Sequence, residues 1–262
     1  MKFLSTIVLT LLCCATVHAQ PVPAPQQWGT ILGRVVYDGK APEVKNLVVN
    51  KAVIPGQKPN VPDESLVVGK NGGLANVFVY LRSKPRQIHP GYTKSEPKKI
   101  LFEAKDYRFV PHAMAIWTYD IFDYRNREPY GMNLNYSALN QGISALLAPD
   151  QSYERSFRVS SNLPQSLLCN IHPWMQARLL VRDNPYFCVT DERGIFCIPN
   201  LPANEEAEFV FWHERVGYLK NIKSDIETFI TNDKGRLQTK LSQPVTDLGE
   251  FRIDPKLFEV SR

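Results

Sequence analysis

The 262-residue sequence lacks the motifs by which most enzymes and membrane proteins are recognised. It contains no Ser-His-Asp order, no glycine-rich phosphate loop, no His-Glu-x-x-His motif and no closely spaced carboxylate pair, so we expect neither an enzyme nor a small-molecule substrate. Beyond Ala15 no apolar run approaches the roughly 20 residues of a membrane span. The basic residues are dispersed, with only Lys98 and Lys99 adjacent, and the net charge is a mild +5. This pattern is typical of a soluble surface and excludes a nucleic-acid partner.

The first residues are typical of a secretory signal peptide. A lysine at position 2 precedes an apolar stretch that ends near Ala15, and Val17-His-Ala19 is a small-x-small-like cleavage site. We therefore expect cleavage after Ala19, which makes residues 1–19 the signal peptide, and a location in the periplasm or outside the cell. Residues 20–27 then form a proline-rich leader.

Strands and turns dominate the rest of the sequence. Twenty prolines spread through the chain disfavour long helices. Segments such as Asn76–Leu81 and Ala207–Trp212 combine β-branched and aromatic residues, which predicts strands. The fold class that follows is all-β, with a length sufficient for one large β domain or two small ones.

The most informative segment is Cys169-Asn-Ile-His172-Pro-Trp-Met175. It sets a thiolate, an imidazole and a thioether at intervals of three residues, which suits a short loop between two strands. One Cys, His ligands and a distant axial Met are the donors of blue-copper sites. The alternative is a loop whose Cys, Trp and Met only pack the end of a sandwich, because free Cys and Met are ordinary core residues.

This segment resembles the ligand loop of the cupredoxins in its short, amicyanin-like form. The upstream run Tyr107–Trp117, with its Phe-x-Pro and alternating apolar residues, is similar to a cupredoxin strand. The Pro-Tyr-Phe-x-Val-Thr-Asp-x-x-Gly segment at 185–194 is similar to one found downstream of the loop in exported bacterial cupredoxin-like proteins of the plastocyanin or methylamine-utilisation type. The resemblance implies a Greek-key cupredoxin-like β sandwich over residues 86–184.

The flanking segments resemble a different small β sandwich, of the transthyretin or carboxypeptidase-regulatory type. In that class the second and third blocks of the pattern follow each other closely, whereas here about a hundred residues separate them. The resemblance therefore implies that residues 28–85 plus 185–262 form this second sandwich and that the cupredoxin-like domain is inserted in it or joined to it. The matching blocks are Gly33-x-Val35, Asp38-Gly39-x-x-Pro42, Val77-x-Val79-Tyr80-Leu81, Thr190-Asp191-x-x-Gly194-x-Phe196 and Thr246-Asp-Leu-Gly249.

One donor departs from the cupredoxin pattern. The family's His-Asn pair, which supplies a distant imidazole, reads Met132-Asn133 here. The implied donor set is then Cys169, His172, Met175 and Met132, and a sulfur-rich set of this kind favours Cu(I) over Cu(II). Two alternatives stay open: Met132 fills the volume of a lost His in a metal-free core, or His112 supplies a fourth donor, although its strand position normally faces away from the metal.

The resemblance also assigns roles to other residues. His172 is normally the solvent-facing ligand and hence the port for electrons, Trp174 shields the metal edge, and Asn133 ties the ligand loops together by hydrogen bonds. The adjacent residues His213 and Glu214 end a strand, where neighbouring side chains point to opposite faces, so we interpret them as structural.

Two further cysteines flank a turn signal. If residues 191–194 make a hairpin turn, Cys188 lies directly opposite Cys197, close enough for a disulfide in an exported protein. The alternative is two independent thiols.

Two functions compete at this point. The first is an exported protein that binds a single copper ion for electron transfer or copper handling, with a redox partner protein. The second is a metal-free, degenerate cupredoxin that serves as a structural or binding module of the cell envelope.

Overall fold

The computed structural model describes residues 27–49, 59–138, 141–226 and 228–259. The predicted signal peptide and all of the leader except Gln27 lie outside the described residues. Within them regular structure is almost entirely β, which confirms the all-β class; the exceptions are the short helix α1 (Pro90–Thr93) and the 3-10 turns η1 (Lys70–Gly72) and η2 (Pro255–Phe258). No helix in these ranges is long and apolar enough to cross a membrane.

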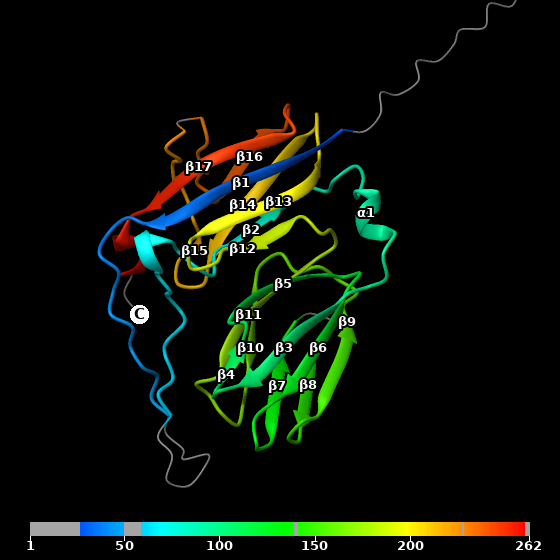
Figure 1. Ribbon diagram of the computed structural model, residues 1–262, viewed down its shortest axis with the longest axis vertical. Helices are drawn as coiled ribbons and strands as arrows, with labels where there is room; N and C mark the ends of the chain where they lie inside the picture. Colours follow the sequence, from blue (N-terminus) through cyan, green and yellow to red (C-terminus); the bar gives the residue numbers. More distant parts are fainter. Residues whose placement is uncertain (1–26, 50–58, 139–140, 227, 260–262) are drawn as a thin grey trace, which may run out of the picture.

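The central part of the chain forms one sandwich, called the inner sandwich here (Figure 1). One sheet has the order β4-β3-β6-β9 and the other β5-β11-β10-β7-β8. Apolar side chains alternate along these strands and meet between the sheets, as Phe102 and Phe122 do with Leu134 and Leu167. The strands are β3 (Lys99–Lys105), β4 (Arg108–Val110), β5 (Ala113–Trp117), β6 (Ile121–Asn126), β7 (Met132–Tyr136), β8 (Ile143–Leu147), β9 (Ser152–Ser156), β10 (Gln165–Leu168) and β11 (Gln176–Arg182).

The flanking parts of the chain form the outer sandwich. Its sheets have the orders β13-β1-β17 and β12-β2-β14-β15, with β16 beside β14. Phe196 and Phe251 of the first sheet pack against Phe211 of the second, at ring-centroid distances of 5.5 and 5.0 Å. The strands are β1 (Trp28–Tyr37), β2 (Phe78–Leu81), β12 (Phe187–Val189), β13 (Ile195–Pro202), β14 (Glu206–His213), β15 (Gly217–Tyr218), β16 (Arg236–Lys240) and β17 (Val245–Ile253).

A third apolar cluster joins the two sandwiches. Trp212 and Tyr80 of the outer sandwich pack there with Leu180 of the inner one. The buried Arg182 guanidinium donates a 2.9 Å hydrogen bond to the Leu81 carbonyl and lies over the Tyr80 ring at 5.1 Å. The interface is therefore fixed by packing and by directional bonds. The exact domain boundaries at residues 86 and 184 stay a prediction.

The expected Cys188–Cys197 hairpin is wrong. A turn does form at residues 191–194, where the Gly194 N–H donates to the Asp191 carbonyl at 2.8 Å. The strands that leave it enter different sheets, however, because Cys188 pairs with Val79 and Cys197 pairs with Leu32. The two cysteines therefore share no ladder, although the Cys188 thiol still contacts the main chain of Cys197, and both are free thiols in this structure.

An arm from the outer sandwich lies against the inner one. It consists of residues 45–49 and 59–65, the blue and cyan segments beside the inner sandwich in Figure 1. The Leu47 N–H donates to the Val61 carbonyl at 2.8 Å, and the Asp63 N–H donates to the Lys45 carbonyl at 2.7 Å. Val61 is fully buried in the core cluster of the inner sandwich. The arm is thus part of the packing of the inner sandwich.

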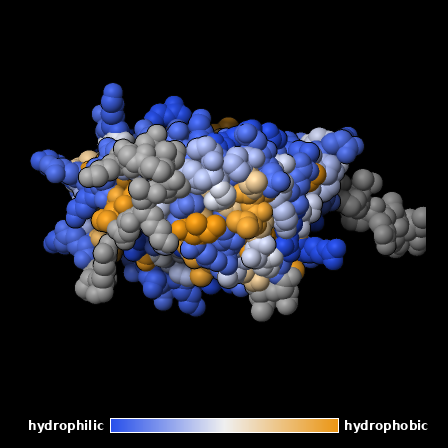
Figure 2. Space-filling view, turned by 90° about the horizontal axis from the view of Figure 1, so that it is seen from below, coloured by the Kyte–Doolittle hydropathy of each residue, from blue (hydrophilic) through white to orange (hydrophobic). Residues whose placement is uncertain are grey.

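The surface is mostly hydrophilic when the molecule is seen from below, with apolar residues gathered near the middle of that face (Figure 2). Exposed apolar side chains of the inner sandwich include Leu146, Leu168 and Ile171. Single exposed side chains of this kind are normal on soluble proteins.

Candidate metal centre

The cysteine loop joins β10 to β11, as predicted for a short loop between strands. Its ends are paired by the main chain: the Cys169 N–H donates to the Met175 carbonyl at 3.1 Å, and the Met175 N–H donates to the His172 carbonyl at 2.9 Å. These bonds continue the β10–β11 ladder, in which Leu168 faces Gln176. The loop is therefore closed at its base, and its three donor residues belong to one tight turn.

Cys169 and His172 are in direct contact. The Cys169 Sγ lies 3.5 Å from the His172 Nδ1, and the His172 N–H points at the same sulfur from 3.4 Å. A sulfur and a nitrogen bound to one tetrahedral ion, with bond lengths of about 2.3 and 2.0 Å, also lie about 3.5 Å apart. The separation of the two donors fits a shared metal ion, and it is also the distance of an S–H···N hydrogen bond.

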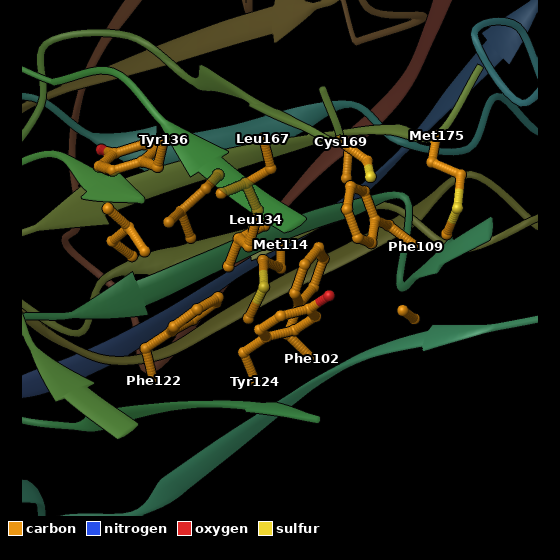
Figure 3. Packing of buried hydrophobic residues seen from close by; sticks show 14 of the residues in the cluster. Phe102, Phe109, Met114, Phe122, Tyr124, Leu134, Tyr136, Leu167, Cys169 and Met175 are labelled. Atoms are coloured by element: carbon orange, nitrogen blue, oxygen red, sulfur yellow. The ribbon is translucent and has the colours of Figure 1, made fainter. Parts of the chain in front are cut away.

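The two methionines are buried in the core around this contact. Met175 is 1% exposed and Met132 is 0% exposed, and both belong to the same apolar cluster as Cys169. Figure 3 shows Cys169 and Met175 at one end of the cluster, with Phe109 beside them. Within the described residues no group of three or more His, Cys, Asp or Glu side chains could hold a metal ion, so a metal bound here would depend on thioethers.

A hydrogen bond places Met132 next to the loop. The Asn170 N–H, directly after Cys169, donates to the Asn133 Oδ1 at 3.2 Å. The Asn133 side chain in turn donates to the Ala145 carbonyl at 3.3 Å, which fixes its orientation on the sheet. The tie predicted for Asn133 is therefore present, and the residue before it lies at the end of β7 that adjoins the loop.

His172 is not the solvent-facing ligand that the resemblance implied. Its side chain is buried at 5% exposure, between the rings of Tyr130 and Trp174, each 5.2 Å away by centroid. The Trp174 Nε1 is also buried, and no residue of the described ranges accepts its hydrogen. The shielding role predicted for Trp174 fits this geometry. The prediction that the His172 imidazole is exposed is wrong, because the ring of Tyr130, which is distant in sequence, covers it.

The surroundings of the thiol are apolar and weakly solvated. Burial raises the pKa of Tyr124 well above its usual value, and the nearby Cys169 and Glu128 raise it further. The Tyr124 hydroxyl is buried and has no hydrogen-bond partner in the described part of the chain. A metal ion bound here would have little solvent around it, so the net charge of the ion and its donors would decide whether the site is stable.

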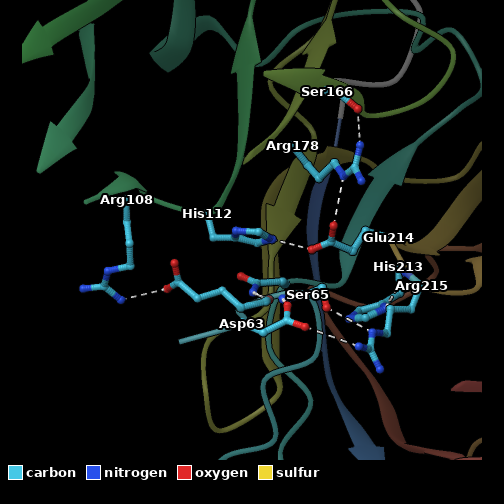
Figure 4. Close-up of polar contacts among 11 residues, drawn as sticks. Asp63, Ser65, Arg108, His112, Ser166, Arg178, His213, Glu214 and Arg215 are labelled. Atoms are coloured by element: carbon cyan, nitrogen blue, oxygen red, sulfur yellow. Dashed lines mark hydrogen bonds and ion pairs between the residues drawn. The ribbon is translucent and has the colours of Figure 1, made fainter. Parts of the chain in front are cut away.

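The His112 imidazole is engaged by a carboxylate of the outer sandwich. Its Nε2 contacts the Glu214 Oε1 of the outer sandwich, and the Arg178 Nε donates to the other oxygen of Glu214 at 3.0 Å (Figure 4). Arg178 also contacts the Ser166 hydroxyl. Burial alone would raise the pKa of Glu214, but the bonds and charges of His112 and Arg178 hold it below its usual value.

This contact was missed from the sequence, because residues 112 and 214 lie on different sandwiches. The neighbouring His213 is fully buried, as its structural interpretation requires, and its Nδ1 accepts a 3.3 Å hydrogen bond from the Arg215 N–H. Burial lowers the pKa of His213 to about 4. His213 is thus a neutral core residue.

No protein-family model matches the sequence, and no curated protein sequence matches it. Among solved structures, a methionine-to-alanine variant of amicyanin with Cu(I) matches at 14% identity and a TM-score of 0.29, over 40% of this chain and 98% of its own. A purple cupredoxin from Nitrosopumilus maritimus matches at 14% identity and a TM-score of 0.28, over 32% and 100%.

The copper-containing nitrite reductase of Thermus scotoductus SA-01 matches at 13% identity and a TM-score of 0.32. The match covers 38% of this chain and only 28% of the reductase. Similarity at these levels does not assign the chain to a family.

Proposed function

We propose that the protein is an exported, cupredoxin-like copper protein that holds one ion, with Cu(I) favoured over Cu(II). Cys169, His172 and Met175 are the donors on the loop, and Met132 is the fourth. The observation that carries the proposal is the 3.5 Å contact between the Cys169 Sγ and the His172 Nδ1, in a loop whose base is closed by main-chain bonds. The signal-peptide pattern that ends at Ala19 supports export.

The charge balance supports Cu(I). A thiolate in an apolar core is stabilised by one positive charge, and a Cu(I)–thiolate pair is neutral overall. Cu(II) would leave a net positive charge in surroundings that hold several neutral phenols. The donor set points the same way, because thiolate and thioether ligands select Cu(I). Copper would supply reversible one-electron chemistry or be carried as cargo, while the protein's own residues fix the donors and exclude water.

Titration with each oxidation state tests this proposal. We expect Cu(I) at about 100 times its dissociation constant to stabilise the protein by about 2.7 kcal/mol, which is a rise in melting temperature of roughly 5–10 °C. Cu(II) should produce no visible thiolate charge-transfer band. Met132→His, which restores an imidazole, should produce one with Cu(II).

Two thiol variants control the measurement. Cys169→Ser should abolish the response to Cu(I), whereas Cys197→Ser, which alters an exposed thiol in the other sandwich, should leave it unchanged. If neither ion changes the melting temperature, and Cys169 is alkylated at the same rate with and without copper, the proposal is wrong. That outcome supports the metal-free structural module.

A further inference from the structure

All four proposed donors are buried, so a copper ion needs a route to them. None of their side chains is more than 5% exposed. Protein interiors are close-packed, and an ion cannot cross them without a cavity or a local opening. The question is therefore which part of the surface gives access to the donor set.

One cavity reaches a donor residue. It has a volume of about 240 Å³ and lies between the arm and the cysteine loop. Trp174 and Met175 line it from the loop, Phe109 from β4, and Val61 from the arm. The walls of four other cavities on the described part of the chain contain none of the four donors.

The mouth of this cavity consists of polar residues. On the arm side, residues 63–65 are half-buried, and on the loop side Gln176 is exposed. The wall on the inner sandwich contains His112, which contacts Glu214. Solvent therefore meets the cavity between the arm and the start of β11, and the thioether residue Met175 belongs to its apolar part.

The charges around the cavity are paired. Glu64 accepts from Arg108 at 3.2 Å, and the carboxylate of Asp63 lies 3.5 Å from Arg215. Glu214 has both His112 and Arg178 as partners (Figure 4). Because each carboxylate already has a cationic or hydrogen-bonding partner, the walls do not form a deep trap for a cation. A soft ion can pass them and gain its ligands only at the thioether and thiolate beyond.

We propose that this cavity is the port through which a copper ion reaches the donor set and leaves it. Met175 is the first donor that the ion meets, and Trp174, whose ring can attract a cation, lines the way to it. The arm forms one wall of the port, so the outer sandwich controls access to a site in the inner one. The inference rests on the proposed function.

The first test does not require copper. Hydrogen peroxide converts methionine to its sulfoxide and is itself reduced to water, and mass spectrometry reports the modified residue. Met175, Met132 and Met114 are all buried, but only Met175 lines this cavity. Met175 should therefore oxidise about tenfold faster than Met132, which is 0% exposed and does not line this cavity, since oxidation follows access to the sulfur.

A blocked cavity provides the matched comparison. Ser65→Trp places a large ring at the mouth from the arm side, and Gln176→Trp does so from the opposite side, so that one variant is available if the other fails to fold. Ser144→Trp, on an exposed position of β8 whose cavity contains no donor, is the control. Both blocking variants should slow the oxidation of Met175, and the control should not.

The second test measures copper exchange in the full-length mature protein. Transfer of Cu(I) from a coloured chelator, and its removal by the same chelator, should both slow by about tenfold in the blocking variants, because entry then needs a conformational opening. The equilibrium affinity should stay unchanged. The Ser144→Trp control should exchange at the normal rate.

Three results would overturn the proposal, and each identifies a different step of it as wrong. Equal oxidation of Met175 and Met132 would show that the cavity gives no access. Fast and blockable oxidation combined with unchanged copper exchange would show that the ion enters elsewhere. Absence of copper binding in the unsubstituted protein would refute the proposed function, and with it the port.

Discussion

The buried His213 makes the stability of this protein depend on pH. Burial lowers its pKa from 6.5 to about 4. The unfolded chain therefore binds a proton on this imidazole at a higher pH than the folded one does. Because the unfolded state holds more protons between these two values, the contribution of His213 to stability is complete above pH 6.5 and is lost as the pH falls toward 4.

The magnitude follows from the difference between these two pKa values. That difference corresponds to about 3 kcal/mol when the loss is complete, and the linkage relation gives about 2 kcal/mol between pH 7.5 and pH 5. This is a large fraction of the roughly 5–15 kcal/mol that ordinarily separates folded and unfolded domains. The loss of stability on acidification should therefore be measurable at pH values above those at which the carboxylates titrate.

Urea unfolding followed by tryptophan fluorescence, at several pH values from about 7.5 to about 5, provides the assay. His213→Phe keeps the ring volume and removes the titration, so its unfolding free energy should decline less steeply than that of the unsubstituted protein, by the same amount of about 2 kcal/mol. The other histidines are common to both proteins and cancel in the comparison. Parallel pH profiles for the two proteins would refute the reasoning.

Three further changes should alter the melting temperature in known directions. Glu214→Gln leaves the two partners of a buried carboxylate without their countercharge and should cost about 3 kcal/mol. Tyr124→Phe removes a buried hydroxyl that has no partner among the described residues and should stabilise the protein by about 1 kcal/mol, as calorimetry would show. Gly194→Ala should lower the free energy of unfolding by more than about 2 kcal/mol, because φ is +75° there and a Cβ would lie 2.0 Å from a carbonyl oxygen. Gly131→Ala is the control, since the nearest atom to its Cβ would lie 3.9 Å away.

Features set by local chemistry could be predicted from the sequence. The all-β class follows from the dispersed prolines and from segments rich in β-branched and aromatic residues, and the loop between β10 and β11 follows from the spacing of Cys169, His172 and Met175. The hydrogen bond from the Asn170 N–H to Asn133 was also within reach, since the resemblance noted in the sequence implied that Asn133 ties the loops together.

Features set by contacts between residues distant in sequence could not be predicted in this way. The alternation of apolar and polar residues around positions 191–194 is the same for a hairpin and for a turn that joins two sheets. The sequence therefore could not show whether Cys188 pairs with Cys197 or with a strand of another sheet. The burial of His172 depends on the ring of Tyr130, and the contact of His112 with Glu214 joins two sandwiches. The sequence of the arm shows no strand-like alternation, because only two main-chain hydrogen bonds join its two segments.

The position of β1 in its sheet determines the order in which the chain can assemble. β1 lies between β13 and β17, so the strand that is synthesised first pairs with strands that are synthesised much later, one of them the last strand. The strands β3 to β11 form one continuous stretch of chain and can close their sandwich, loop included, while the rest is still being made. Until β17 arrives, β1 has an unpaired edge of the kind that promotes aggregation. A chain that ends before β17 would therefore keep a complete loop and its donors while one edge of β1 stays unpaired.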